Sequence, residues 1–248
     1  MRIFAVSDIH GYYDILRETL KSVGFRENNE NDLLVCCGDY WDRGNHPYEV
    51  MTYLMSLNNV VLVKGNHEYL MESYLDRGYP LRHDYQNGTD KTFQTLVNKI
   101  KVKNKQPILP QVNKVINEFY SKMVDYFETK NYVFVHGWIP CNMKGFTTDF
   151  PLYDFNWRNG NWSESCWYNG MDLADKGILV PNKTTVCGHW HCSYGWARDA
   201  KRKSQTTMSE FDDDACWDIY ENEGIYAIDR CTAYTGEMNV LILEDDLL

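Results

Sequence analysis

The chain of 248 residues carries 35 aspartates and glutamates against 25 lysines and arginines, which gives a formal net charge of −10. This acidic balance argues against a nucleic-acid partner, because general nucleic-acid binders are usually basic. No apolar run approaches the length that spans a bilayer, so we expect no membrane partner. The short apolar start is not a signal-peptide core, and we expect a cytoplasmic protein whose eight cysteines are reduced.

Strands and helices are predicted to alternate over the first third of the chain. Apolar runs mark three strands, and apolar residues at helical spacing mark a helix after each of the first two. In chain order these elements are Arg2–Val6, Tyr13–Val23, Asp32–Cys37, Tyr48–Leu57 and Asn59–Val63. Such alternation predicts an α/β fold with a parallel sheet that is covered on both faces.

Polar residues follow each of these three strands. Asp8 and His10 come after the first strand, Asp39 after the second and Asn66 after the third. Because parallel strands end at one edge of a sheet, and ligands bind at that edge, we expect these side chains to lie close together.

The pattern becomes helical between about residues 75 and 130. Helices are predicted at Asp90–Ile100 and Gln111–Phe127, on either side of the basic stretch 101–105. We interpret this part as a helical insertion in a single domain that spans residues 1–248. Its basic residues form either a solvated helical face or a cap that steers an anionic substrate.

The second half returns to strands, two of which lead directly into histidines. The predicted strands are Tyr132–Val135, Thr184–Cys187, Gly224–Ile228 and Met238–Leu243. The first two precede His136 and His189, and the last two are expected to form a closing pair. Between His189 and this closing pair, the charged segment 201–215 is predicted to be a loop.

Five of the seven histidines stand in short motifs, and aspartates and an asparagine stand in the earlier motifs. Such oxygen and nitrogen donors suit two divalent cations, which form a clamp for displacement at phosphorus when they lie about 3.5–4 Å apart. We expect Asp39 to bridge both cations, His191 to complete the first, and His136 with His189 to complete the second. The expected ligands are Asp8, His10, Asp39, Asn66, His136, His189 and His191.

Three further residues are candidates for chemistry rather than metal binding. His67 is interpreted as the general acid, with Asp42 fixing its tautomer and raising its pKa. Arg43 suits phosphate oxygens, Arg158 is a candidate second clamp, and Asn66 is expected to contact substrate as well as metal. The structural alternatives are a simple hydrogen-bonded pair for His67 and Asp42 and surface salt bridges for the arginines.

Tryptophans stand beside the motifs, at Trp41, Trp138 and Trp190, and more aromatic residues crowd positions 146–168. They either pack behind the ligands or form a wall that stacks a base or an aromatic side chain of the substrate.

The motifs resemble those of the calcineurin-like metallophosphoesterases, and most closely the phosphoprotein phosphatase branch. That branch includes bacterial and bacteriophage Ser/Thr protein phosphatases and symmetrical diadenosine tetraphosphate hydrolases. Its signature is close to G-D-x-H-G, G-D-x-V-D-R-G and G-N-H-E. The matching residues are Asp8, His10, Gly11, Gly38, Asp39, Asp42, Arg43, Gly44 and Gly65 to Glu68.

Ser7 stands where the signature has glycine, and Trp41 where it has valine. The resemblance implies a four-layer αββα sandwich with two divalent ions, most often manganese, with iron or zinc as alternatives. It further implies hydrolysis of phosphate monoesters by direct attack of a metal-bridging hydroxide.

Three functions remain open at this point. The first is a Ser/Thr protein phosphatase, which acts on a phosphorylated protein. The second is a symmetrical dinucleoside polyphosphate hydrolase, in which Trp138 and the aromatic segment would stack adenine. The third is a catalytically inactive metal-binding interaction protein.

Overall fold

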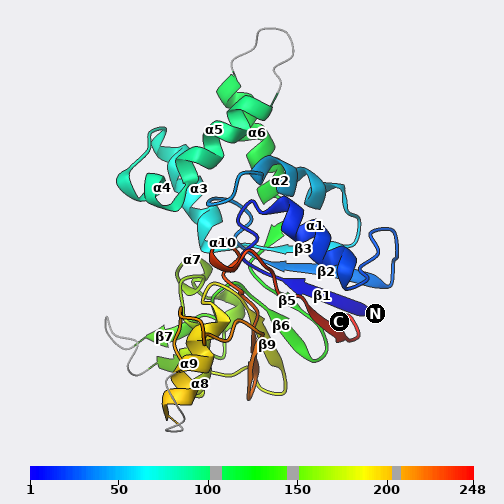
Figure 1. Ribbon diagram of the computed structural model, residues 1–248, viewed down its shortest axis with the longest axis vertical. Helices are drawn as coiled ribbons and strands as arrows, with labels where there is room; N and C mark the ends of the chain where they lie inside the picture. The colour runs from blue at the N-terminus through cyan, green and yellow to red at the C-terminus, as the bar shows by residue number, and fades with distance from the viewer. Residues whose placement is uncertain (101–107, 144–150, 203–207) are drawn as a thin grey trace.

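Two stacked sheets form the centre of the protein, and helices cover the outer face of each (Figure 1). The computed structural model describes residues 1–100, 108–143, 151–202 and 208–248. The four layers follow αββα order, because each sheet presents one apolar face to helices and the other to the second sheet. This confirms the fold class expected from the motifs.

The first sheet has five strands in the order β12-β1-β2-β3-β4. Strands β1 to β4 run parallel, and β12 pairs antiparallel with β1 at the edge. Their bounds are Arg2–Val6 for β1, Asp32–Cys37 for β2, Val60–Val63 for β3, Met123–Val124 for β4 and Leu241–Glu244 for β12. The carboxyl ends of β1, β2 and β3 therefore lie side by side.

The second sheet has the order β10-β11-β9-β6-β5, and its central strands β11, β9 and β6 are parallel. The strands are Phe127–Glu128 for β5, Tyr132–Phe134 for β6, Thr184–Cys187 for β9, Tyr220–Asn222 for β10 and Ile225–Ala227 for β11. A separate two-stranded ribbon joins β7, Cys141–Met143, to β8, Pro151–Tyr153.

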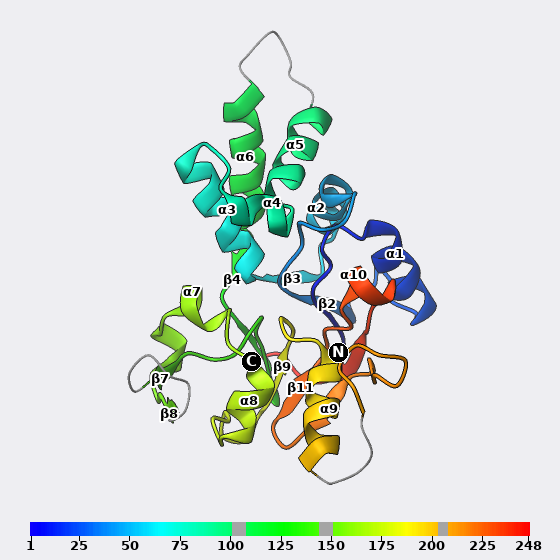
Figure 2. The same ribbon diagram turned by 60° about the vertical axis from the view of Figure 1, so that its left-hand side comes forward.

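Helices α3 to α6 group together at one end of the molecule, and α8 and α9 cover the second sheet (Figure 2). The helices before residue 125 are α1 Tyr13–Ser22, α2 Pro47–Ser56, α3 Asn66–Arg77, α4 Arg82–Asn87, α5 Thr89–Lys99 and α6 Ile108–Tyr120. The later helices are η1 Trp157–Asn159, a 3₁₀ helix, α7 Trp162–Ser165, α8 Gly170–Asp175, α9 Cys192–Arg202 and α10 Thr232–Thr235. No helix in the described ranges is both long enough and apolar enough to cross a membrane.

Alternating side chains on the first sheet serve two different cores. Phe4 and Leu34 face the helices, whereas Ile3 and Val35 face the second sheet, where they meet Phe134. Successive residues of a strand point to opposite faces, so a strand buried on both sides reads as a continuous apolar run. This explains why β2 is buried along its whole length.

The early elements lie where the sequence predicted them, but two later predictions are wrong. Helix α6 ends at Tyr120 instead of continuing to Phe127. The apolar residues beyond it keep helical spacing, yet they are drawn into strands, because β4 pairs with β3 and β5 with β6. The expected closing pair is also wrong: β11 and β12 belong to different sheets. The basic stretch 101–105 lies outside the described residues.

A buried carboxylate anchors the start of β2. Asp32 is fully buried and accepts hydrogen bonds from the guanidinium groups of Arg2, at 2.7 and 3.0 Å, and Arg26, at 3.0 and 3.3 Å. Burial would raise the pKa of Asp32, but the two arginines hold it well below its usual value.

Replacing this carboxylate by an amide is expected to destabilise the fold in a pH-dependent way. At pH 7, Asp32→Asn should lower the free energy of unfolding by about 1–2 kcal/mol, a range reduced because both arginines reach solvent. A depressed pKa stabilises the folded state above the unfolded-state pKa of about 3.9, and that stability is lost as the pH falls below it. In urea titrations the deficit should therefore shrink below about pH 4. Exposed Asp213→Asn is the control, and equal unfolding midpoints at pH 7 would contradict the prediction.

Candidate metal centre

Strained backbone marks the loops that follow the strands. Asp8, His10 and Asp39 have positive φ angles of 51°, 47° and 57°. A residue with a side chain seldom adopts this left-handed region, and when such residues cluster they usually do so at functional sites. Among the described residues, eight residues other than glycine have positive φ, and six of these belong to the motifs: the three just named together with Asp42, Arg43 and His189.

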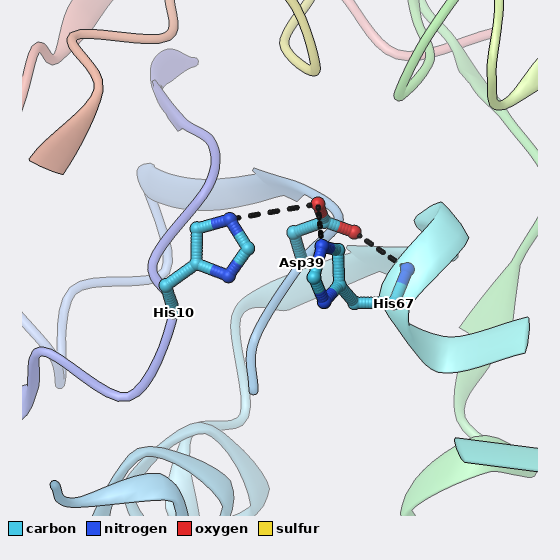
Figure 3. A group of neighbouring side chains, drawn as sticks. All are labelled: His10, Asp39 and His67. Atoms are coloured by element: carbon cyan, nitrogen blue, oxygen red, sulfur yellow. Dashed lines mark hydrogen bonds and ion pairs between the residues drawn. The ribbon is translucent and has the colours of Figure 1, made fainter. Parts of the chain in front are cut away.

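The Asp39 carboxylate lies at the centre of the site. His10 Nε2 and His67 Nε2 lie 3.7 and 3.8 Å from its Oδ2 (Figure 3), and His136 Nε2 lies 3.4 Å from its Oδ1. Two groups of potential ligand atoms result, and within each group the atoms lie within 4.8 Å of one another. One group joins Asp39 to His10 and His67, and the other joins it to His136 and His189. Asp39 is the member common to both, which is the position expected of a bridging ligand.

The surroundings of His136 fit a cation. Its Nδ1 lies 2.7 Å from the carbonyl oxygen of Cys37, and its Nε2 lies 2.8 Å from Asn66 Oδ1. A neutral imidazole has one N–H, so only a protonated ring can donate to both oxygens. Burial would lower the pKa of His136, but the charges of Asp39 and Asp8 raise it to about 10. A divalent cation bound to Nε2 and to the oxygens of Asn66 and Asp39 would supply the positive charge in place of that proton.

Two other histidines are suited to bind as neutral ligands. Burial and the charge on His136 lower the pKa of His189 to about 3. Burial and the charge on His67 likewise hold the pKa of His10 well below its usual value. His10 Nδ1 lies 2.8 Å from the Trp41 carbonyl, and if it donates there, Nε2 keeps its lone pair for a metal.

Asp8 adds a second carboxylate to the first group. Its Oδ1 lies 3.9 Å from His10 Nε2, and its Oδ2 accepts a hydrogen bond from the His189 backbone N–H at 3.0 Å. Burial and the charge on Asp39 raise the pKa of Asp8. Two buried carboxylates at one place call for nearby positive charge, which divalent cations would provide.

His67 is held by Asp42, and Asp42 is held by the helical insertion. His67 Nδ1 lies 2.7 Å from Asp42 Oδ2, which also accepts from the Thr89 hydroxyl at 2.8 Å. The Asp42 backbone N–H donates to Thr92 Oγ1 at 3.0 Å. Burial would lower the pKa of His67, but Asp39 and Asp42 raise it. Sequence reasoning missed Thr89 and Thr92, because no local pattern links them to a residue about fifty positions earlier.

Glu68 links the loop that follows β2 to the loop that follows β3. Its Oε2 accepts from the backbone N–H groups of Asp39 and Gly65, each at 2.9 Å, and its Oε1 accepts from that of Tyr40 at 3.0 Å. The side chain is fully buried, and burial together with the charge on Asp39 raises its pKa to about 7. Glu68 therefore positions the backbone, and it contacts Asp39 through the main-chain N–H of that residue.

The two arginines expected to bind phosphate differ in their surroundings. Arg43 is exposed, forms no ion pair within the described parts of the chain, and its charge acts on His10 and His67. Arg158 instead binds Glu128 through two hydrogen bonds of 2.9 and 2.6 Å. Its role as a phosphate clamp stays a prediction that requires this ion pair to open.

His191 lies outside both ligand groups. Its Nε2 is 2.8 Å from Glu210 Oε1, and its ring stacks on Trp190 and Trp217. Its role as a ligand also stays a prediction, and it requires the imidazole to leave Glu210. Glu210 belongs to the segment 201–215, of which residues 203–207 lie outside the described residues.

The tryptophans divide into two kinds. Trp41 and Trp138 are fully buried: Trp41 stacks on Phe119, and the Trp138 indole N–H donates to the carbonyl of Ile178 at 2.9 Å. Both therefore pack behind the ligands, and the expectation that Trp138 stacks a base is wrong. By contrast, 47% of Trp167 is exposed.

Three buried imidazoles and the partly exposed His189 thus surround one shared carboxylate, an arrangement that offers donors to two metal ions. Residues 1–193 match the sequence profile of the calcineurin-like phosphoesterases. The chain belongs to the calcineurin-like phosphoesterase family.

Several known proteins are similar to this chain. The symmetrical bis(5'-nucleosyl)-tetraphosphatase of Buchnera aphidicola subsp. Acyrthosiphon pisum (strain Tuc7) is 41% identical over 69 residues, which are 27% of this chain and 24% of that protein. The enzyme of that name from Xanthomonas axonopodis pv. citri (strain 306) is 35% identical over 69 residues, 27% of this chain and 21% of that protein. The similarity thus spans about a quarter of these relatives or less.

A crystal structure of the cold-active protein-tyrosine phosphatase of a psychrophilic Shewanella shares the fold. The TM-score is 0.57 at 18% identity, over 98% of this chain and 75% of that chain.

Neutralising the shared carboxylate should weaken the binding of both cations. Asp39→Asn removes one negative charge and one ligand oxygen from both groups at once. After dialysis, metal analysis should give fewer than about one ion per chain, against about two for the unchanged protein. Asp42→Asn is the matched control, because Asp42 belongs to neither group, and it should keep both ions. Full occupancy in Asp39→Asn would exclude a bridging role.

Proposed function

We propose that the protein hydrolyses phosphate esters by direct transfer of the phosphoryl group to water, with two divalent cations as cofactors. The observation that carries this proposal is the position of Asp39 between two sets of imidazoles, beside a hydrogen-bonded His67–Asp42 pair. Cations held there would activate water and neutralise charge on the phosphoryl oxygens. Manganese is the metal we propose, since the resemblance implies it most often.

His67 has the features of a general acid. Asp42 accepts from Nδ1, so Nε2 is the nitrogen that faces Asp39 and the reaction centre. Asp39 and Asp42 raise the pKa of His67 and so favour the protonated ring that a general acid needs. As the phosphorus–oxygen bond to the leaving group breaks, Nε2 gives its proton to that oxygen, while the oxygen of water forms the new bond to phosphorus.

Arg43 completes the set of groups that bind the phosphoryl group. Its exposed guanidinium is available to substrate, and its planar donors match two phosphate oxygens. Asn66 holds His136 and is proposed to contact substrate as well. With these residues in place, an inactive metal-binding protein is the less favoured interpretation.

Removing the acid should slow turnover without removing the metals. His67→Asn keeps the size of the side chain but has no proton to give, and we expect kcat to fall by about 10²–10⁴-fold. Metal content is measured in parallel and should not change. His83→Asn, which alters a histidine outside the motifs, is the matched control. Unchanged turnover in His67→Asn would remove it from the acid role, and loss of metal would make it a ligand instead.

For the substrate, we now place a dinucleoside polyphosphate ahead of the phosphorylated protein that the sequence favoured. The relatives that are similar to this chain over 69 residues carry the name symmetrical bis(5'-nucleosyl)-tetraphosphatase. In addition, the exposed Trp167 lies against His189, with ring centroids 6.0 Å apart, where it can meet an aromatic part of a substrate.

A direct comparison of two substrates tests this order. The manganese-loaded protein is assayed on diadenosine tetraphosphate and on a phosphothreonine peptide, with a chelated sample that should be inactive. We expect kcat/KM to be at least about fivefold higher for the dinucleotide, since stacking of one base contributes about 1 kcal/mol or more. A higher value for the peptide would restore the Ser/Thr protein phosphatase, and activity on neither with metal bound would support the interaction protein.

A further inference from the structure

We infer that the pocket between Trp167 and Trp190 is a nucleobase subsite that adjoins the second ligand group. The pocket has a volume of about 250 Å³ and is also lined by Asn169, Asp172 and Leu173. This inference rests on the proposed phosphoesterase function, because it assigns the part of the substrate that the metal ligands do not bind.

The two tryptophans place the pocket beside the reaction centre. Trp167 and Trp190 both meet the His189 ring edge-on, with centroids 6.0 and 6.4 Å apart and interplanar angles of 86° and 78°. The backbone of Trp167 also accepts a hydrogen bond from His189. A ring bound against Trp167 is therefore next to a ligand of the proposed second cation, within reach of a phosphate held there.

The lining combines an apolar wall with a polar edge. Trp167, Trp190 and Leu173 supply aromatic and aliphatic surface, on which every base can stack through its π-face. Asn169 also lines the pocket, and its Nδ2 is buried and has no hydrogen-bond partner among the residues that the structure describes. A buried amide donor without a partner is costly, so a ligand that accepts from it would gain affinity.

These features favour a nucleobase over the side chain of a phosphotyrosine. A base presents ring nitrogens that accept from an amide such as that of Asn169. Its amino groups donate to a carboxylate such as Asp172, whose oxygens also accept from Tyr194 and Arg198. The edge of a phenyl ring has neither, and it would leave the amide unpaired. The pocket accommodates one flat ring system, which matches one half of a dinucleoside polyphosphate.

Substitutions at two positions test the aromatic surface and the amide donor of the pocket separately. Trp167→Ala removes the stacking surface but keeps the backbone carbonyl, and Trp167→Phe restores an aromatic face. Asn169→Asp keeps the side-chain oxygen that caps α8 by accepting from the Asp172 N–H, but it removes the amide donor. Phe155→Ala is the matched control, because Phe155 is 90% exposed and does not line the pocket.

Binding of adenosine, which has no phosphate, is measured on the metal-loaded protein by saturation-transfer NMR and equilibrium dialysis. We expect Trp167→Ala to weaken it at least about tenfold, Trp167→Phe to recover most of that loss, and Asn169→Asp to weaken it as well. Phe155→Ala should bind as the unchanged protein does. Metal content of each variant shows that the centre is intact.

Three outcomes would overturn the subsite. The unchanged protein binds no detectable adenosine, or Trp167→Ala binds adenosine as well as the unchanged protein does. The third is that Trp167→Ala loses binding of a phosphotyrosine peptide but keeps binding of adenosine. Activity distinguishes this from failure of the proposed function. If Trp167→Ala loses more kcat/KM on diadenosine tetraphosphate than on phosphothreonine peptide, the subsite serves catalysis. If the unchanged protein hydrolyses neither but binds adenosine through Trp167, the subsite stands and the proposed function fails.

Discussion

The burial of two carboxylates at the end of β2 is the constraint on which the rest of the site depends. Asp39 and Glu68 are both almost inaccessible to solvent, and each makes the charge on the other more costly. Glu68 is stabilised by three backbone N–H groups, which fix the loops after β2 and β3 against one another. Asp39 is stabilised by imidazoles on two sides, and the same arrangement suits it to share two cations.

The left-handed backbone of the loops follows from the same constraint. Asp8 and His10 follow β1 and Asp39 follows β2, yet their side chains converge on one point, which regular extended chain would carry them past. Close packing leaves little room for adjustment: a side chain at Gly65 would collide with Asp39, and one at Gly188 with Asp8. The cost of positive φ is thus offset by contacts that only this backbone path allows.

The helical insertion positions the proposed acid. Thr89 and Thr92 of α5 form hydrogen bonds to Asp42, and Asp42 forms one to His67. The orientation of the proposed acid therefore depends on how α5 packs against the loop that carries Asp42. A substitution that loosens α5 should act on proton transfer more than on metal binding, because no cluster ligand comes from that helix.

Much of this arrangement could be predicted from the sequence, and the exceptions share a physical cause. Strand ends and ligands are local: Asp8, Asp39 and Asn66 follow apolar runs within a few residues, and the edge of a parallel sheet brings them together. Pairing is not local. The apolar residues after Tyr120 keep helical spacing, although they form strands of two different sheets. An apolar run likewise does not reveal whether β11 pairs with β12.

Contacts between side chains that are far apart in the sequence could not be predicted either. The ion pair of Arg158 with Glu128 and the contact of His191 with Glu210 depend on which segments the fold brings together. Burial is the other missing quantity. Trp138 and Trp167 both stand near motifs in the sequence, but the first is enclosed in the core and the second is half exposed.

Net charge and site charge are separate quantities in this protein. The chain as a whole is acidic, with a net charge of −10, which on its face disfavours an anionic substrate. At the centre, however, Asp8 and Asp39 are the carboxylates of the ligand set, and two divalent cations would more than balance them. Exposed Arg43 adds positive charge at the same place. The field that a phosphate meets is therefore set by the ligands buried at the sheet edge, while the acidic surface serves solubility and repels polyanions that do not reach the centre.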